Sequence, residues 1–346
     1  MISEIDPLTD PRWLALLARS PGASAFHTRG WLEAVYKTYG HKPAALAVSG
    51  PDGELLSAVV YCRVLSRITG RRLISLPFSD HCVPIVASAS DLESLLATFE
   101  EKAGVDNCRY MELRPTSMLP FVGSKWKASE NFYLHRLDLR HGAAVAYQNF
   151  HRDCVQRRID HAEKEGVVVT IGRDPDTVKK FHELVLHTRR RHGVPPQPID
   201  WFTNVMDCMG ERATIRLAYK AGQAIAGILT LQYATTTFYK YGASEAHFHR
   251  LGAMPYLFWH AIQDAIARGH QELDLGRSEC DNHGLVTFKE RLGAKRSPLV
   301  YLRSPAVAAE GFSRRLWKSS IAQTACRYMP NRCLLGLGML FYRHID

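Results

Sequence analysis

Polar residues that can carry out group-transfer chemistry are concentrated in one stretch, DLGRSECDNHGLVTFKERLGAK, residues 274–295. Arg277 and Lys289 can bind a carboxylate or a phosphate, because both side chains are positively charged at neutral pH. Ser278 and Asn282 carry a hydroxyl and an amide that can orient an acceptor group. The stretch predicts a site in which charge recognition and acceptor positioning occur within one small volume.

Transfer of an acyl group to an amine needs this combination. The amine, with a pKa near ~10, must lose a proton, and the reacting carbonyl needs hydrogen-bond donors for its developing oxyanion. Asp274 ends an apolar run, where loops commonly build sites, and Asp281 or His283 can relay the proton. We predict catalytic roles for Asp274, Arg277, Ser278 and Lys289, and a substrate-binding role for Asn282.

A structural role is the alternative for part of this stretch. Asn282 and Gly284 can form a turn and cap the helix that follows. That explanation does not extend to Lys289, which lies five residues after Gly284 and more than one turn inside the helix. We expect Phe288 to point into the core and Lys289 to hold a flexible ammonium group at a cleft. On this interpretation, replacing Lys289 changes stability by less than about 0.5 kcal/mol.

Two arginines in the second half of the chain are candidates for an anion site. In FHRDCVQRRIDHAEKEG, Arg158 falls in the middle of the apolar arc of a helical wheel. A buried guanidinium is costly unless paired, so Arg158 either pairs with a buried acid or carbonyl or projects toward a phosphate or carboxylate. In HTRRRHGVPPQP, three arginines precede a proline-rich loop; they complement the helix dipole or, with Arg191 foremost, bind an anion.

Two shorter motifs complete the candidate residues. SLPFSDHC places Asp80 and His81 just after a strand-like run, where they serve as a general base or as a turn cap. In YKYGASEAHFHRLG, Tyr239 and Tyr241 point to one side of a strand and Lys240 to the other. A solvent-facing lysine is the alternative there. We predict substrate-binding roles for Asp80, His81, Lys240 and Tyr241, together with Arg158 and Arg191.

The predicted elements that must position these residues follow the same order in both halves of the chain. The first half has the pattern of a helix, a hairpin, a strand, an amphipathic helix and two strands. The second half begins with two helices, at about 146–165 and 175–192, then a hairpin, a helix, a strand, a short helix and a closing strand. This repeat predicts an α/β fold with mixed sheets in two similar domains, residues 1–145 and 146–305.

Composition narrows the class of protein. The chain has 346 residues and a net charge of +10, which indicates an anionic partner or simply a solvated basic surface. It has no apolar run of about 18 residues and its first residues lack the apolar region of a signal peptide, so we expect a cytoplasmic protein. Its eight cysteines form no CxxC pair and no zinc-ligand spacing, so we expect reduced thiols and no metal site.

Residues 306–346 are expected to form a basic helical tail. The segment carries six Lys or Arg residues against two acids, and its apolar stretch CLLGLGMLF is too short to span a bilayer. The tail either packs as a helix on the domains or makes a peripheral contact with a membrane surface or a partner.

Several motifs together resemble one enzyme family. The pattern YGAS…P…W…A…G…DLGRS…N.G…FK…GA, with the earlier matches WLEAVY, SLPFSD, RRIDHAEKEG and TRRRHGVP, resembles the FemAB-like and BioF2-like GNAT acyltransferases over about residues 25–302. The resemblance implies two tandem GNAT-like domains and transfer of an acyl or aminoacyl group to an amine. Fem-type members use aminoacyl-tRNA and cell-wall precursors, and BioF2-like members often accompany exopolysaccharide or envelope systems.

One departure from the family pattern concerns the donor. GNAT enzymes that use acyl-CoA hold its pyrophosphate with Arg/Gln-x-x-Gly-x-Gly/Ala, whereas this chain has HRLGAMPY, in which Met254 adds bulk where backbone amides should approach phosphate. Acyl-CoA held differently and aminoacyl-tRNA both stay open as donors, with no tightly bound cofactor. The acceptor is expected to be a small molecule or an envelope precursor. The competing function is a non-catalytic GNAT-like binding or assembly module. In such a module, side chains would fill the cleft.

Overall fold

The computed structural model describes residues 1–66, 68–117, 119, 125–305 and 320–344, which form two compact units. Within the described chain, the first unit comprises residues 1–132, 298–305 and 339–344, and the second comprises residues 133–297 and 320–338. The division falls inside strand β6 (Lys127–Asp138), because this long strand supplies residues to both units. The predicted domain boundary near residue 145 lies beyond the end of that strand.

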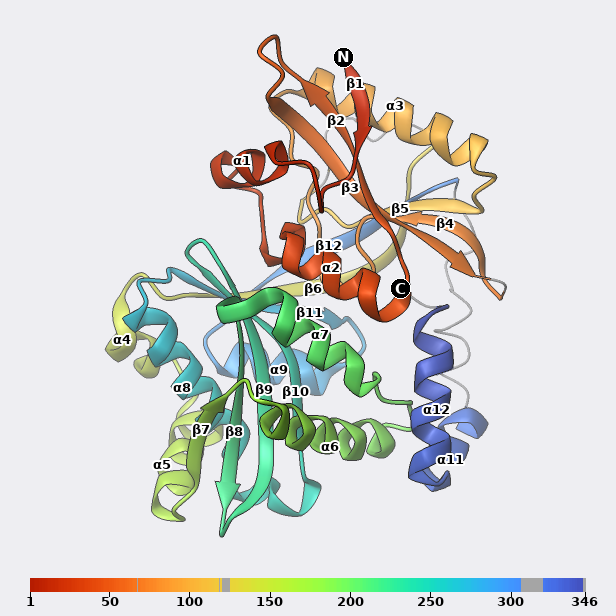
Figure 1. The fold of residues 1–346 in the computed structure, drawn as a ribbon. Helices are drawn as coiled ribbons and strands as arrows, with labels where there is room; N and C mark the ends of the chain where they lie inside the picture. Colours follow the sequence, from red (N-terminus) through yellow and green to blue (C-terminus); the bar gives the residue numbers. More distant parts are fainter. Residues whose placement is uncertain (67, 118, 120–124, 306–319, 345–346) are drawn as a thin grey trace. The chain divides into compact units, whose positions relative to one another are not determined.

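The first unit is built on a mixed sheet with the strand order β1-β2-β3-β4-β5-β12. Its strands pair antiparallel except for β4 and β5, which are parallel. Helix α3 packs leucines and Phe99 against β2 and β3 (Figure 1). The elements are β1 (Ile2–Ile5), α1 (Arg12–Arg19), α2 (Arg29–Tyr39), β2 (Pro43–Ser49), β3 (Leu55–Ser66), β4 (Gly70–Ile74), α3 (Ala89–Val105), β5 (Tyr110–Leu113) and β12 (Lys295–Ser304).

The second unit has the strand order β6-β11-β10-β9-β8-β7. Strands β7 to β10 form an antiparallel meander, and β10 pairs parallel with β11. The elements after β6 are α4 (Gly142–Gln148), a π-helix (Arg152–Gln156), α5 (Arg157–Lys164), β7 (Val168–Gly172), α6 (Pro175–Arg191), α7 (Ile199–Met209), β8 (Ala213–Lys220), β9 (Gln223–Tyr233), β10 (Thr236–Ser244), α8 (Ala253–Ala267), β11 (Glu272–Glu279) and α9 (His283–Arg291).

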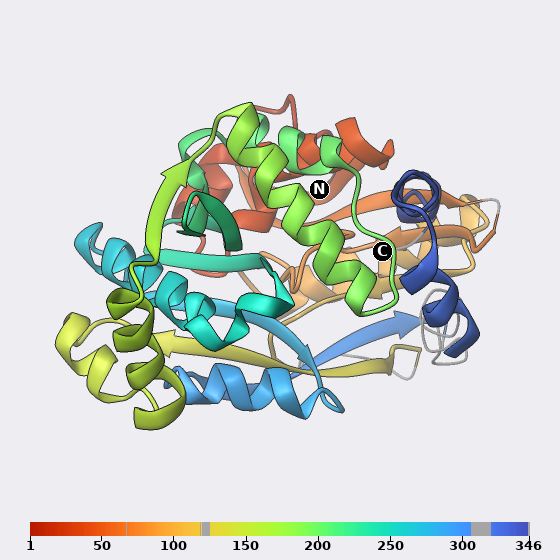
Figure 2. The same cartoon turned by 90° about the horizontal axis from the view of Figure 1, so that it is seen from below.

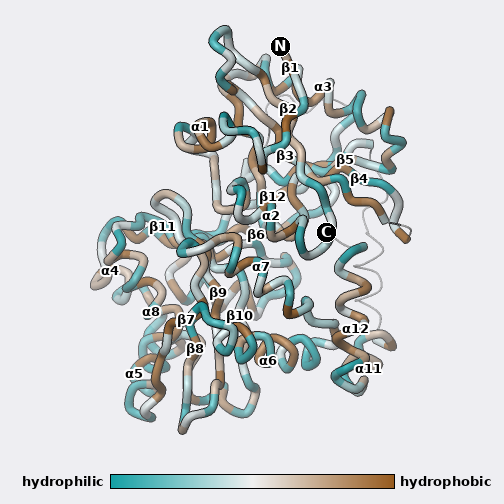
Figure 3. Tube along the Cα trace, in the orientation of Figure 1, coloured by the Kyte–Doolittle hydropathy of each residue, from teal (hydrophilic) through white to brown (hydrophobic). Residues whose placement is uncertain are grey.

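Different helices cover the two faces of the sheet in the second unit (Figures 1 and 2). Ala226 and Ile228 of β9 face the cluster that includes residues of α8. Gly227 between them lies under α6, where a Cβ would come within 2.9 Å of Phe181. A strand buried on both faces is expected to be apolar throughout, and Figure 3 shows this apolar run along β9. The predicted α/β fold with mixed sheets is confirmed.

Two helices of the tail, α11 (Ser320–Tyr328) and α12 (Asn331–Tyr342), confirm that the tail is helical. Cys326 and Leu334 pack against Leu186 of α6. Arg190 Nη2 donates to the Met329 carbonyl at 2.6 Å, which fixes the turn between the two helices. Residues 306–319 of the predicted tail lie outside the described residues. Among the described helices, none is both long enough and apolar enough to cross a bilayer.

His27 of the first unit predicts a pH dependence of stability. Its fully buried imidazole lies 3.0 Å from Ser24 Oγ through Nδ1 and 3.0 Å from Val83 O through Nε2. Burial lowers the pKa of His27 from 6.5 to about 4. Between these values the unfolded chain binds a proton that the folded chain excludes. The free energy of unfolding therefore falls as the pH is lowered from 6.5 toward 4.

Urea unfolding at about pH 7 and about pH 4.5 measures this loss. We expect His27→Gln to remove roughly 2–3 kcal/mol of the pH dependence, since one pKa unit corresponds to about 1.4 kcal/mol. The exposed His141, replaced by Gln, is the matched control and should leave the pH dependence unchanged. The same pH dependence in His27→Gln as in the unaltered protein would contradict the assignment.

Candidate functional site

Strands β10 and β11 separate soon after they meet. Their described parallel pairing is confined to Thr236–Phe238 opposite Glu272–Asp274. The register between β9 and β10 shifts between Tyr239 and Tyr241, so Lys240 is the extra residue of a β-bulge. Bulges re-aim side chains and occur often beside active sites. Beyond this point the second halves of β10 and β11 have no described pairing with each other.

A kink at Gly276 turns β11 at the same level. Gly276 has φ +68°, a left-handed conformation that side chains disfavour. Its N–H donates to Asp274 Oδ1 at 2.7 Å, and Lys289 Nζ donates to the carbonyls of Gly276 and Arg277, both at 3.0 Å. Asp274 and Lys289 are each only 2% exposed. These two charged residues therefore fix the path of β11 where it leaves β10.

Lys289 does not hold a flexible charge at a cleft, so that expectation is wrong. Val286 and Lys289, three residues apart, form the buried face of α9. The ammonium group donates hydrogen bonds to two backbone carbonyls of β11. Position within the helix excluded a capping role for Lys289, but could not show which face of the helix the sheet covers.

Asn282 is the N-cap of α9, as the structural alternative predicted. Its Oδ1 accepts from the Leu285 N–H at 3.1 Å, which satisfies a backbone donor that the first turn leaves unpaired. Arg277, in the part of β11 beyond the kink, is half-buried. A substrate contact of either residue stays a prediction.

His135 on β6 is a candidate that the sequence analysis missed. It is fully buried, and its Nδ1 lies 3.4 Å from Ser278 Oγ, itself only 1% exposed. Its Nε2 is buried and has no hydrogen-bond partner among the described residues. Burial, then the charges of Lys289 and Arg296, lower the pKa of His135 to about 4, so the imidazole is neutral at neutral pH. The available signal was its place two residues before Leu137, on the apolar face of the strand.

Arg158 and Arg191 lie at the two ends of the segment that joins β10 to α8. Arg191 Nη1 donates to the Ser244 carbonyl at 2.9 Å, and Arg158 Nη1 donates to the Arg250 carbonyl at 2.8 Å. For Arg158 this is the carbonyl pairing named by its structural alternative, whereas the alternative for Arg191 was an interaction with the helix dipole. Each guanidinium has five N–H donors, so both retain capacity for an anion.

Arg158 is exposed, which corrects its predicted place on the apolar arc. The preceding residues, Arg152–Gln156, form a π-helix rather than an α-helix, so the 100° wheel does not hold across this segment. The buried positions are Val155, Ile159 and Ala162, and Arg158 flanks them.

The backbone of α5 lies close to the N-cap residue of α8. Gly252, the N-cap of α8, has φ +76°, and a Cβ built there would lie 2.3 Å from the Arg158 carbonyl oxygen. The carbonyl oxygen of Arg158 therefore lies against the Gly252 backbone and crowds this side of the N-cap. Met254 packs toward β10, with its Cε 3.2 Å from a Cβ built on Gly242.

Lys240 and Tyr241 lie together at the bulge of β10. Both are half-buried, and Lys240 Nζ lies 5.4 Å from the centroid of the Tyr241 ring. The Tyr241 hydroxyl accepts from Trp201 Nε1 at 2.9 Å, and its ring meets Phe202 edge to face. These contacts hold Tyr241 rigidly beside the separating strands.

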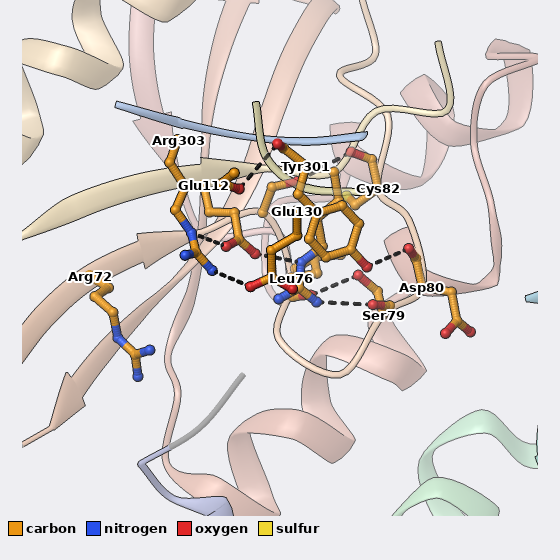
Figure 4. Close-up of polar contacts among 12 residues, drawn as sticks. Arg72, Leu76, Ser79, Asp80, Cys82, Glu112, Glu130, Tyr301 and Arg303 are labelled. Atoms are coloured by element: carbon orange, nitrogen blue, oxygen red, sulfur yellow. Dashed lines mark hydrogen bonds and ion pairs between the residues drawn. The ribbon is translucent and has the colours of Figure 1, made fainter. Parts of the chain in front are cut away.

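A buried chain of ion pairs lies in the first unit (Figure 4). Arg114 Nε donates to Glu112 Oε1 at 2.9 Å, and Glu112 Oε2 accepts from Arg303 Nε at 2.6 Å. Arg303 Nη2 then donates to Glu130 Oε1 at 3.0 Å. Opposite charges alternate along this chain, so each buried guanidinium contacts a carboxylate.

The ion chain fixes the loop that carries Asp80. Arg114 Nη1 donates to the carbonyls of Leu76 and Ser79, at 3.0 and 2.9 Å. Leu76 and Phe78 have φ values of 59° and 64°. Such left-handed conformations of large residues persist only where surrounding contacts enforce them, and they are common in binding loops.

Asp80 and His81 differ in their surroundings. The Asp80 carbonyl accepts from the Tyr301 hydroxyl at 2.7 Å, while its half-buried carboxylate points away from the ion chain (Figure 4). His81 is 3% exposed, and its ring packs edge to face on Phe26. These two residues belong to the first unit, and the other nine predicted site residues belong to the second. No His, Cys, Asp and Glu cluster suited to a metal occurs among the residues described.

The family relationship of the second unit follows from its sequence. Residues 136–290 match the family described as acetyltransferase (GNAT) domain. This segment is similar to a GNAT acetyltransferase domain. It contains the separating strands, the Gly276 kink and α8. No curated protein matches the chain.

Solved structures extend the GNAT likeness over both units. FemX covers 86% of this chain and 96% of its own, at 15% identity and a TM-score of 0.69. The C-terminal domain of a putative lysylphosphatidylglycerol synthetase from Agrobacterium fabrum covers 91% and 95%, at 15% identity and a TM-score of 0.55. A tandem GNAT protein from the clavulanic acid biosynthesis pathway covers 90% and 100%, at 12% identity and a TM-score of 0.53. The predicted FemAB-like, tandem GNAT fold is confirmed.

Proposed function

We propose that this GNAT protein transfers the aminoacyl group of an aminoacyl-tRNA to the amine of an envelope precursor. The observation that carries the proposal is the separation of β10 from β11 at the Lys240 bulge and the Gly276 kink. Two strands that diverge can present backbone N–H groups to a bound ester and polarise its carbonyl.

Crowding at the N-cap of α8 favours tRNA over acyl-CoA as the donor. The Arg158 carbonyl crowds the N-cap residue Gly252, and Met254 adds apolar bulk in the first turn of the same helix, which leaves less room for a CoA pyrophosphate. An aminoacyl-tRNA needs no pyrophosphate cradle. Its polyanionic backbone matches the net charge of +10. Likeness to FemX and to a lysylphosphatidylglycerol synthetase supports an envelope acceptor.

The reaction is an aminolysis of an ester. The acceptor amine, once deprotonated, attacks the ester carbonyl, a C–N bond forms, the C–O bond to the terminal ribose breaks, and the leaving hydroxyl takes a proton. Arg277, half-buried on β11 beyond the kink, binds an anionic group of a substrate, and Lys240 and Tyr241 orient the acceptor across from it.

Transfer from isotope-labelled aminoacyl-tRNA and from acetyl-CoA to a panel of amines tests the donor. We expect product with aminoacyl-tRNA and none with acetyl-CoA. Arg277→Met should lower transfer at least tenfold with unchanged thermal stability. Arg268→Met, on the exposed end of α8, is the matched control and should retain full transfer.

Saturable turnover of acetyl-CoA would overturn the donor assignment and retain an acyltransferase. Equal transfer by Arg277→Met and Arg268→Met would remove Arg277 from the site. Binding of aminoacyl-tRNA with no transfer to any amine would instead support the non-catalytic binding module, because burial of Asp274, Ser278 and Lys289 suits a scaffold as well.

A further inference from the structure

Helix α11 exposes an apolar stripe. Its buried contact is made by Cys326, which packs toward α6. Ile321 and Tyr328, two turns apart on the helix, are 80% and 85% exposed. Ala325 lies between them and is also exposed. Residues at i, i+4 and i+7 share one face of an α-helix, so these three form a stripe that the described residues leave uncovered.

Helix α12 repeats the arrangement. Leu334 and Gly338 form its buried side, and Gly338 approaches so closely that a Cβ would lie 2.1 Å from the Pro196 carbonyl. Met339 and Leu340 are 52% and 58% exposed, and Gly336 one turn earlier is exposed as well. Each of these two consecutive helices therefore has one apolar side that packs on the protein and a second apolar stripe that is exposed to solvent.

The charge of this region has one sign. Between residues 311 and 345 the sequence has no Asp or Glu but has six Lys or Arg residues. Arg327 of α11 and Arg332 and Arg343 at the ends of α12 are exposed. Exposed apolar side chains flanked by arginines without acids suit an anionic lipid surface, where the apolar groups enter the acyl boundary and the guanidinium groups meet phosphates.

The two helices are held on the protein rather than hanging from it. Arg190 Nη2 donates to the Met329 carbonyl at 2.6 Å, at the turn between the helices. A Cβ on Gly193 would come within 2.7 Å of the Gln323 carbonyl, so the backbones of the α6 end and α11 are in close contact. A surface fixed in this way binds without the entropic cost of first ordering the helices.

We propose that α11 and α12 form a docking surface for a bilayer rich in anionic phospholipid. The inference is independent of the donor and of the transfer reaction. An RNA partner would bind the arginines but would leave Ile321, Met339 and Leu340 exposed to water. A bilayer covers both kinds of group.

Sedimentation of the full-length protein with vesicles of phosphatidylglycerol and phosphatidylcholine, or of phosphatidylcholine alone, tests this surface. We expect binding to the anionic vesicles that weakens as salt is raised, and at least tenfold weaker binding to the neutral vesicles. Ile321→Ser/Tyr328→Ser should lower binding to anionic vesicles at least tenfold. Val105→Ser, at a site 86% exposed in the first unit, is the matched control and should bind like the unaltered protein.

A melting temperature measured for each variant separates lost binding from lost folding. Arg332→Gln, a second variant on an exposed side chain, should weaken binding and flatten its salt dependence. Equal binding to both vesicle types, no binding to either, or an equal loss in Val105→Ser would overturn the proposal. If the protein with Ile321 and Tyr328 intact bound tRNA but no vesicles, and Arg332→Gln lost that tRNA binding, RNA would be the partner instead.

Discussion

Replacing Lys289 with Met is expected to lower the free energy of unfolding by about 2–4 kcal/mol. The change keeps the apolar stem but removes the donor to the buried carbonyl of Gly276 and the partly buried carbonyl of Arg277. Each carbonyl left without a partner costs about 1–3 kcal/mol. Urea unfolding at neutral pH, followed by circular dichroism, measures the effect.

The matched control is Lys179→Met on the exposed side of α6, which should change stability by less than about 0.5 kcal/mol. A Lys289→Met protein that unfolds at the same urea concentration as the unaltered protein would contradict the kink assignment. If that variant also bound aminoacyl-tRNA more weakly, Lys289 would be a ligand contact after all. The loss of stability should come with weaker transfer, because the path of β11 positions Arg277.

Arg114→Met is expected to destabilise the first unit by about 3–5 kcal/mol, the range for breaking a buried ion pair. Arg114 is 2% exposed and joins Glu112 to the carbonyls of Leu76 and Ser79. Its loss leaves two carboxylates and one guanidinium in the chain of ion pairs, and it releases the loop that carries Asp80. Thermal unfolding and limited proteolysis of that loop are the measurements.

An exposed ion pair provides the control for Arg114. Arg140 Nη2 lies 2.5 Å from Asp138 Oδ2, yet the Arg140 side chain is 65% exposed, so Arg140→Met should leave the stability close to that of the unaltered protein. Combining Glu112→Gln with Arg114→Met should cost less than the sum of the single changes, because the two side chains share one interaction. Strict additivity would show that Arg114 acts only through the loop carbonyls.

Local patterns predicted what depends on neighbours in the sequence. The α/β fold followed from the order of apolar runs and turn residues, and the cap at Asn282 followed from the residues just before an apolar helix. The predicted place of Arg158 on the apolar arc was wrong because a helical wheel assumes one period. Arg152–Gln156 is a π-helix, which changes the phase before α5 begins.

Long-range pairing decided the remainder. Lys289 was expected at a cleft because no local pattern shows that β11 passes beneath α9. The sequence did not predict His135 as a site residue because its contact is with Ser278, which is distant in the sequence and adjacent only in the sheet. Arg114 and Arg303 are likewise joined through Glu112 only when β5 and β12 pair. The role of such side chains depends on a strand that is distant in the sequence, so the local pattern alone does not define it.

The single strand β6 limits how this chain can be divided. A fragment that begins at residue 146 would lack β6 and would leave β11 as an open edge, with unpaired backbone groups that invite association with other chains. A cut between residues 132 and 133 would break the strand itself. Recombinant dissection at either place therefore risks an insoluble product. Exchange of the first unit between homologous proteins has to carry β6 and β12 along with it.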